Sequence, residues 1–196
     1  MLQPNLARWT WTGDPRDNEW RDLREIIRSE SLLTGQSFTL ASGRHTGYFF
    51  DMKRTMMHPR GAFLVGKLLF DKIRNDRDVE YIGGLEIGSI PLVTAIAAHS
   101  WQDRPVNAFF VRKIPKDHGT SKLIDGQFKP GSTVILFEDV TTTGGSVLKA
   151  VHAVRDQDCK VKRIITIVDR LEGADENLKK EGLALDYLFT THDFSD

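Results

Sequence analysis

The residues best suited to chemistry lie together in residues 134–147, which read VILFEDVTTTGGSV. The four apolar residues at the start predict a buried strand, and Glu138 and Asp139 stand at its carboxyl end. The small residues 141–146 predict a turn that opens a helix, whose first N–H groups are unpaired and carry a partial positive charge. Because the glycines of this turn let a ligand approach the backbone closely, the stretch predicts a cradle for an anion.

The two acidic residues narrow the choice of anion. Carboxylates this close to a phosphate would repel it, so Glu138 and Asp139 are expected to meet sugar hydroxyls or a divalent cation instead. A phosphate on one side and a polyol on the other describe a sugar phosphate. This is the class of ligand that the stretch favours.

A second candidate is the polar segment 115–131, which contains Lys116 and His118 and follows Arg112 and Lys113. It is too long and too charged for an ordinary connection in a small domain, and loops of this kind are usually functional or disordered. The segment is therefore a second candidate for a functional role.

Apolar runs and helical patterns alternate along most of the chain, and the runs are continuous rather than interrupted by polar residues. This pattern predicts an α/β fold with a central parallel sheet flanked by helices, in which ligands bind beyond the carboxyl ends of the strands. The expected strands are residues 81–85, 108–111, 134–137 and 164–168, and the expected helices are one that starts at Pro59 and carries Phe63, Val65, Leu69 and Ile73, and two at about residues 90–100 and 146–155.

The first part of the chain predicts a smaller lobe. Asp17 is a candidate N-cap for a helix that has apolar residues at helical spacing. Residues 36–53 contain two strand-like pieces, 38–40 and 48–52, separated by residues typical of a turn. Together these features predict a hairpin-like lobe beside the sheet.

Composition argues against several classes of function. The chain has 196 residues, which fits one domain, and its 27 Lys+Arg balance its 27 Asp+Glu, so no net charge attracts nucleic acid or an anionic membrane. A single cysteine, Cys159, excludes an intramolecular disulfide and fits a reducing compartment. No apolar stretch approaches the roughly 18 residues of a membrane span, and residues 1–14 lack the apolar core of a signal peptide. We therefore expect a cytoplasmic protein with no nucleic acid and no membrane as partner.

Beyond the phosphate turn, four further segments point to a known family. They read FTLASGRHTGYFFD (38–51), GLEIGSIPL (84–92), VRKIPKDHG (111–119) and VDRLEG (168–173). With the TTTGGS turn, and in this order, they resemble the type I phosphoribosyltransferases, and within that family the branch that acts on orotate.

The resemblance implies the family's fold, in which a small N-terminal hood lobe and a flexible catalytic loop accompany the central sheet. It implies one phosphoribosyltransferase domain over residues 1–196. Within it, residues 18–58 would form the N-terminal helix and hood lobe, and 59–196 the core with a mobile loop at 112–126. Residues 1–17 are expected to form a leader that has no counterpart in the resemblance and is assigned no function.

The resemblance also implies a reaction. The 5-phosphoribosyl group of phosphoribosyl pyrophosphate (PRPP) would pass to orotate, giving orotidine 5′-monophosphate and pyrophosphate in pyrimidine biosynthesis. Mg²⁺ would be the cofactor, held mainly by PRPP, so no metal ligand is assigned directly. The protein would be a homodimer with shared active sites, because in this family the loop closes over the partner subunit's site.

Residue roles carry over where the motifs align. The catalytic residues would be Lys116, His118 and Asp139. The PRPP-binding residues would be Arg112, Lys113, Lys116, His118, Glu138, Asp139, Val140, Thr141, Thr142, Thr143, Gly144, Gly145 and Ser146. The orotate-binding residues would be Phe49, Phe50, Thr142 and Arg170.

Two alternatives stay open for the function and two for the residues. The chain could transfer phosphoribose to another base, or bind PRPP as a non-catalytic regulator, although a regulator needs no cationic lid. Arg170 could instead pair with Asp169 or Glu172 at the surface, and one of two adjacent phenylalanines in a strand usually faces the core. Some family members carry lysines where this chain has Ala41 and Gly88.

Overall fold

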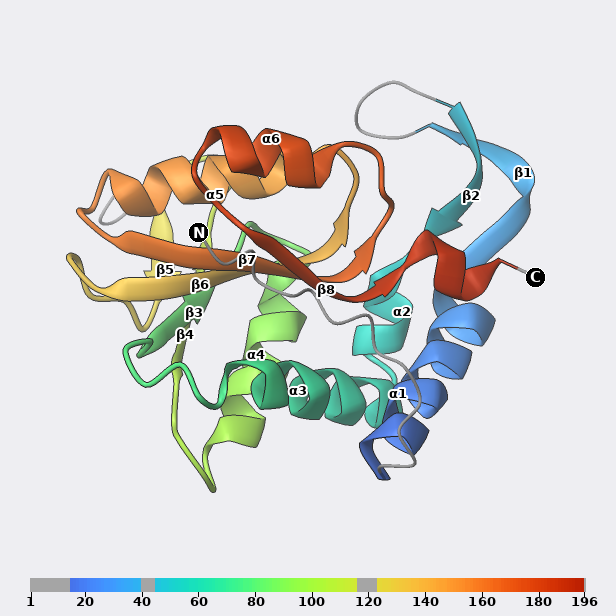
Figure 1. The fold of residues 1–196 in the computed structure, drawn as a ribbon, viewed down its shortest axis with the longest axis horizontal. Helices are drawn as coiled ribbons and strands as arrows, with labels where there is room; N and C mark the ends of the chain where they lie inside the picture. The colour runs from blue at the N-terminus through green and yellow to red at the C-terminus, as the bar shows by residue number, and fades with distance from the viewer. Residues whose placement is uncertain (1–14, 40–44, 116–122, 196) are drawn as a thin grey trace, which may run out of the picture.

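The computed structural model describes residues 15–39, 45–115 and 123–195 (Figure 1). Its helical segments are α1 (Pro15–Ile26), the π-helical turn η1 (Ile27–Ser31), α2 (Met52–Met56), α3 (Pro59–Ile73), α4 (Ser89–Ser100), α5 (Gly145–Arg155), α6 (Ala174–Lys180) and the 3-10 turn η2 (Thr191–Phe194). Its strands are β1 (Leu32–Thr39), β2 (His45–Phe50), β3 (Tyr81–Gly83), β4 (Asn107–Val111), β5 (Ile124–Gly126), β6 (Thr133–Thr141), β7 (Lys160–Asp169) and β8 (Leu185–Thr190).

The central sheet confirms the expected α/β fold. Its six strands lie in the order β5-β4-β3-β6-β7-β8, and all neighbours are parallel except the antiparallel pair β4 and β5. Figure 1 shows α5 and α6 over one face of this sheet and α3 and α4 over the other. None of the helices within the described ranges is both long and apolar enough to span a membrane.

The continuous apolar run of β6 follows from this two-sided burial. Ile135 and Phe137 belong to the apolar cluster shared with α3 and α4, whereas Val134 and Leu136 belong to the cluster shared with α5 and α6. Successive side chains of a strand point to opposite faces, so a sheet covered on both sides needs apolar residues at every position. The strand runs on to Thr141, four residues beyond the predicted end, so Glu138 and Asp139 lie inside its carboxyl-terminal half and Thr141 belongs to the strand, not to the turn.

The small lobe is the antiparallel pair β1 and β2, which stands beside the large sheet (Figure 1). Its strands are longer and earlier than the sequence predicts, and Met52 begins α2 instead of ending a strand. The Asp17 N-cap is wrong, because α1 already begins at Pro15, a residue well suited to the first turn of a helix.

Besides α2 and the turns η1 and η2, the sequence also did not predict three elements of the large sheet and its cover. Strand β5 lies inside the segment predicted as the loop 112–126, where Ile124 pairs with Val111 of β4. The other two, α6 and β8, complete the sheet and its cover near the end of the chain. All three are short, and β8 is an edge strand in which only three of six side chains, those of Leu185, Leu188 and Phe189, are buried. Neither a long apolar run nor a clear period therefore marks these elements in the sequence.

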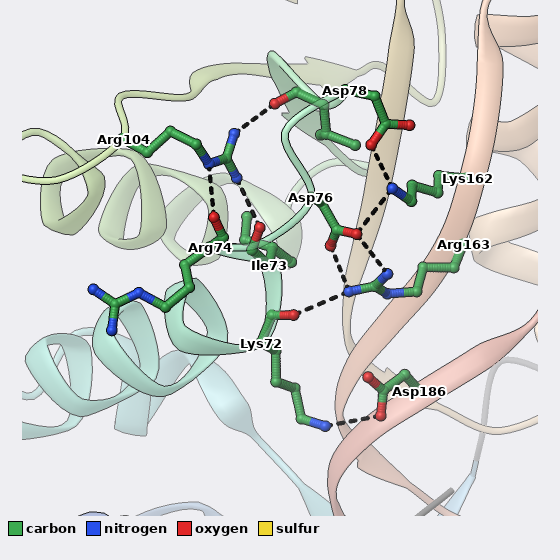
Figure 2. A network of polar contacts seen from close by, with 10 residues as sticks. Lys72, Ile73, Arg74, Asp76, Asp78, Arg104, Lys162, Arg163 and Asp186 are labelled. Atoms are coloured by element: carbon green, nitrogen blue, oxygen red, sulfur yellow. Dashed lines mark hydrogen bonds and ion pairs between the residues drawn. The ribbon is translucent and has the colours of Figure 1, made fainter. Parts of the chain in front are cut away.

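A network of hydrogen bonds and ion pairs connects the loop after α3 to the amino-terminal part of β7 (Figure 2). The Asp76 carboxylate accepts hydrogen bonds from Arg163, with the closer contact at 2.7 Å, and pairs with Lys162 at 2.9 Å. Lys72 pairs with Asp186 of β8 at 2.8 Å. The network lies at the opposite end of the strands from Glu138 and Asp139, so it supports the sheet and not the candidate site.

Arg104 closes the carboxyl end of α3 in the same network. Its guanidinium donates to the backbone carbonyls of Ile73 at 2.8 Å, Arg74 at 3.2 Å and Val79 at 2.7 Å (Figure 2). The Arg104→Ala variant leaves these acceptors to water, and we expect it to lower the free energy of unfolding by about 2 kcal/mol. Urea denaturation measures this directly.

The matched control is Arg74→Ala, which removes exposed ion pairs to Asp71 and Asp103. Pairs of this kind contribute little, so the control should lose less than about 1 kcal/mol. Equal losses for the two variants would contradict the capping role of Arg104.

Candidate active site

A cavity of about 440 Å³ lies where β6 ends and α5 begins, against the end of β2 and the segment after β3. This is the carboxyl end of the parallel strands, where ligands bind in sheets of this type. The cavity is lined by Phe49, Phe50, Lys53, Leu85, Glu86, Ile87, Gly88, Lys113, Glu138, Asp139, Val140, Thr141, Thr142, Thr143, Gly144, Gly145, Ser146, Val147 and Arg170.

The turn between β6 and α5 has the geometry of an anion site. Gly144 has φ 82°, a left-handed conformation that strains any residue with a side chain, and it stands at the N-cap position of α5 without capping by a side chain. The Asn177 amide of α6 donates to the Thr143 carbonyl at 3.0 Å and holds the turn in place. The first N–H groups of α5 therefore face the cavity with their partial positive charge available to an anion.

The two carboxyl groups beside this turn lie in an environment that disfavours their charge. Burial raises the pKa of Glu138 to about 8, the nearby charge of Asp139 adds to the effect, and Lys113 opposes it. Burial also raises the pKa of Asp139, against the hydrogen bond from the Val140 N–H at 2.9 Å and the positive charge of Lys53. Both groups would be stabilised by a bound cation or by hydroxyl donors.

Two buried oxygen atoms of the cavity have no hydrogen-bond partner within the described residues. They are Oε2 of Glu138 and Oγ1 of Thr141. Buried polar atoms are nearly always paired in proteins, and leaving one unpaired costs about 1–3 kcal/mol. A ligand with hydroxyl groups at this place would supply the missing partners.

The raised pKa of Glu138 predicts a pH dependence of folding. The folded protein keeps the Glu138 proton up to a pH of about 8, whereas the unfolded chain releases it near the ordinary value of 4.5. Between these values the folded state binds more protons, so its stability falls as the pH rises and levels off above about 8. The Glu138→Gln variant removes this effect.

The stability gain of Glu138→Gln over the wild type is therefore expected to grow by about 3 kcal/mol between pH 5 and pH 8. Urea denaturation at several pH values measures it. The control is Glu176→Gln on the exposed side of α6, which should keep the pH dependence of the wild type. A gain for Glu138→Gln that does not change with pH would contradict the burial argument.

Arg170 lies in the wall of the cavity, and its side chain is only 2% exposed. It donates to Oε1 of Glu172 at 2.8 Å and to Oγ1 of Thr46 at 3.2 Å, and its guanidinium lies 4.3 Å from the centre of the Tyr48 ring. The pair with Glu172 that the sequence suggested is therefore present but buried, and it orients the arginine at the cavity.

Phe49 and Phe50 both line the cavity, although they face different surroundings. Phe50 is 5% exposed and packs edge-on against Phe194, whereas Phe49 is half-buried and stacks on Phe38 at a centroid distance of 5.8 Å. The expectation that one of the two reaches the core fits Phe50.

The cationic residues at positions 112–118 fall into three groups. Lys113 lines the cavity, and its N–H donates to Oε1 of Glu86 at 2.8 Å. Arg112 does not line the cavity; it pairs with Asp125 of the neighbouring β5 at 3.4 Å. Lys116 and His118 lie outside the described residues.

Several residues that line the cavity stand outside the sequence motifs. Lys53 had no motif to mark it, because α2 is a single short helix that only the fold brings to the end of β6. In the segment 84–89, the fold explains why a glycine stands at position 88. A Cβ atom at position 88 would lie 2.6 Å from Oδ2 of Asp139, so a side chain cannot occupy this place unless Asp139 moves.

Comparison with known proteins agrees with this geometry. The family model described as the phosphoribosyl transferase domain matches residues 55–189. The orotate phosphoribosyltransferase of Rhodopseudomonas palustris (strain BisB5) is 45% identical over 177 residues, which cover 88% of this chain and 94% of that protein. The crystal structure of Mycobacterium tuberculosis H37Rv orotate phosphoribosyltransferase in complex with Fe(III) dicitrate has a TM-score of 0.80 at 38% identity, over 91% of this chain and 99% of that chain.

The same mycobacterial enzyme has also been solved in complex with PRPP. That structure has a TM-score of 0.76 at 36% identity and covers 90% of this chain and 98% of that chain.

Proposed function

The chain belongs to the phosphoribosyltransferase family and, within it, to the orotate phosphoribosyltransferases, and from this premise we propose how its cavity works. The enzyme transfers the 5-phosphoribosyl group of PRPP to orotate and yields orotidine 5′-monophosphate and pyrophosphate. One observation carries the assignment of the cavity: a turn with a left-handed glycine, the open start of α5 and two buried carboxyl groups lie side by side in one wall.

PRPP fits this wall in one orientation. The N–H groups at the start of α5 and the hydroxyl groups of residues 141–146 receive the 5′-phosphate. Glu138 and Asp139 accept hydrogen bonds from the 2′- and 3′-hydroxyl groups of the ribose, which supplies the partner that Oε2 of Glu138 lacks. The pyrophosphate then points away from α5, towards the segment 85–88 and Lys113.

Orotate is proposed to bind between Phe49, Phe50 and Arg170, with Thr142 at the ribose side. The planar guanidinium of Arg170 suits a carboxylate, and its contacts with Glu172 and Thr46 hold it in one orientation. The aromatic rings offer an apolar surface to the flat base.

Catalysis follows from the charges that develop during the reaction. The bond from C1′ to the pyrophosphate oxygen breaks, a bond from C1′ to N1 of orotate forms, and the N1 proton passes to the departing pyrophosphate or to water. Positive charge grows on the ribose beside Asp139, and negative charge grows on the pyrophosphate beside Lys113. Side chains already placed for these charges lower the barrier most.

We propose that Mg²⁺ enters with PRPP and is held mainly by it. The carboxyl groups of Glu138 and Asp139 fit such an ion, because burial disfavours their charge until a cation or a hydroxyl donor arrives. When bound, Mg²⁺ neutralises part of the charge of the pyrophosphate.

We further propose a homodimer with shared active sites, in the cytoplasm. Met57 after α2, Phe63 of α3 and Trp101 after α4 are 72%, 57% and 75% exposed. These exposed apolar side chains are available to a second copy. Cys159 is buried and unpaired with another cysteine, which fits a reducing compartment.

Complementation between variants tests the shared sites. Lys116→Ala removes a residue expected on the loop, and Asp139→Asn changes the core of the cavity, so each variant alone should be almost inactive. If each loop serves the partner subunit, an equal mixture after subunit exchange should recover about a quarter of the wild-type activity, because half of the dimers then hold one intact site. No recovery, or a monomer mass by light scattering, would contradict the proposal.

A panel of bases tests the reaction itself. With PRPP and Mg²⁺, the enzyme is given orotate, uracil, adenine, hypoxanthine or nicotinate in separate assays, and pyrophosphate release is measured. Turnover with orotate alone is expected. Turnover with another base would overturn the proposed orotate site, and binding of PRPP without any turnover would point to a regulator.

A further inference from the structure

Lys53 brings a positive charge into the cavity that neither the sequence motifs nor the proposed mechanism uses. It lies in α2, directly after β2, and its side chain lines the cavity together with Asp139 and Gly88. The ammonium group lies 2.6 Å from Oδ1 of Asp51. About half of the side chain remains exposed, at 49%, so it can still meet a ligand.

The fold fixes where Lys53 points. The opposite side of α2 is buried through Met52, Thr55 and Met56, which are at most 4% exposed. The Thr55 hydroxyl shares a hydrogen bond of 2.7 Å with the Ser31 hydroxyl, and the Thr55 N–H donates to the same Ser31 oxygen at 3.1 Å. These buried contacts hold α2 against η1, so Lys53 remains on the side that faces the cavity.

The start of α3 packs closely against another side of α2. A Cβ atom at Gly61 would lie 2.2 Å from the Thr55 carbonyl oxygen, so α3 approaches α2 as closely as only a glycine permits. With α2 held on both sides, the position of Lys53 is set by packed backbone rather than by a free loop. The backbone at Lys53 therefore needs little rearrangement for its side chain to bind an anion.

The surroundings of Lys53 identify the part of the substrate that it can reach. Its charge acts on Asp139, and Asp139 lies so close to Gly88 that no side chain fits between them. Lys53, Asp139 and Gly88 therefore meet in one corner of the cavity. The phosphate turn occupies a different part of the wall, at the start of α5.

The segment that faces this corner supplies no cation of its own. Residues 84–89 read GLEIGS, and the only charged side chain among them, Glu86, is an acid that accepts the N–H of Lys113. An anionic group lying here needs a cation from another element. Lys53 from α2 is the cation that the described residues place beside Gly88 and Asp139.

We propose that Lys53 binds the pyrophosphate group of PRPP and stabilises it as it leaves. This inference rests on the proposed function and adds a residue to it. In the free enzyme the ammonium group pairs with Asp51 and faces Asp139, and in the complex it also donates to pyrophosphate oxygens. The mechanism thereby gains a cation from the body of the subunit in addition to Lys113.

The test compares Lys53→Met, Lys53→Arg and the wild type in both directions of the reaction. In the reverse direction, the KM for pyrophosphate should rise about 10-fold or more for Lys53→Met, while the KM for orotidine 5′-monophosphate stays within about 2-fold. Lys53→Arg, which keeps the charge, should recover most of the loss. The control is Arg54→Met, a neighbour in α2 that pairs with Glu30 outside the cavity, and it should behave as the wild type.

Calorimetry measures the dissociation constant for pyrophosphate without turnover. The result for Lys53 therefore does not depend on which base the enzyme accepts. A dissociation constant for pyrophosphate that Lys53→Met leaves unchanged would overturn the inference and leave Lys53 as a partner of Asp51 only. A selective rise in the KM for orotate would also overturn it, because Lys53 would then hold the base. A wild-type enzyme that binds pyrophosphate through Lys53 but does not use orotate would refute the proposed function alone.

Discussion

Asp139→Asn is expected to lower kcat by about 10²- to 10³-fold with little change in fold. The positive charge that grows on the ribose in the transition state is stabilised by a carboxylate that burial has kept poorly solvated. Asparagine has the same shape and can still accept the Val140 N–H through its oxygen, so the change removes the charge and keeps the packing. Steady-state kinetics with PRPP and orotate measure the effect.

The split between the kinetic constants distinguishes this role from simple binding. If the charge acts in the transition state, kcat falls more than the KM for PRPP rises. Asp186→Asn in β8 is the control, because Asp186 pairs with Lys72 away from the cavity, and its kcat should remain near that of the wild type. An unchanged kcat for Asp139→Asn would remove Asp139 from the catalytic residues.

Gly144→Ala is expected to raise the KM for PRPP by about 10²-fold, because small displacements at a positioned site have effects of this size. The left-handed φ of 82° costs an alanine about 1–2 kcal/mol, and the turn relieves this strain by moving the N–H groups that face the phosphate. Direct collision is not the cause, since a Cβ atom there would approach Leu178 at an ordinary 3.6 Å.

Gly182→Ala separates strain from function. Gly182 also has a positive φ, 71°, and a Cβ atom there meets open space, at the end of α6 and away from the cavity. Both variants should lose about 1 kcal/mol of stability, and only Gly144→Ala should lose affinity for PRPP. Calorimetry of PRPP binding compares them, and a similar affinity for the two variants would contradict the placement of the phosphate.

The parts of the site that could be predicted from the sequence are those formed by consecutive residues. The strand, the carboxylate pair and the glycine turn of residues 134–147 follow one another in the chain, so local rules for strands, turns and helix starts were enough to place them. The alternation of β6 between two apolar clusters likewise follows from its unbroken apolar run.

The parts that the sequence did not show depend on contacts between distant segments. Lys53 reaches the cavity because Ser31 and Gly61 hold α2, and neither residue marks a motif. Arg170 left two interpretations open, and only its burial against Tyr48 and Thr46 decides that its pair with Glu172 lies in the cavity wall. Arg112, in contrast, was predicted to bind PRPP but lies outside the cavity, where it pairs with Asp125. This pair could not be predicted because Asp125 lies in β5, a strand that the sequence did not reveal.

The most direct test of the whole account is a crystal structure of the enzyme with orotidine 5′-monophosphate. This product carries both the phosphate and the base, so its position assigns both ends of the cavity at once. We expect its phosphate at the N–H groups that begin α5, its ribose hydroxyls at Glu138 and Asp139, and its carboxylate at Arg170. A nucleotide bound in the opposite orientation, or outside this cavity, would contradict the account.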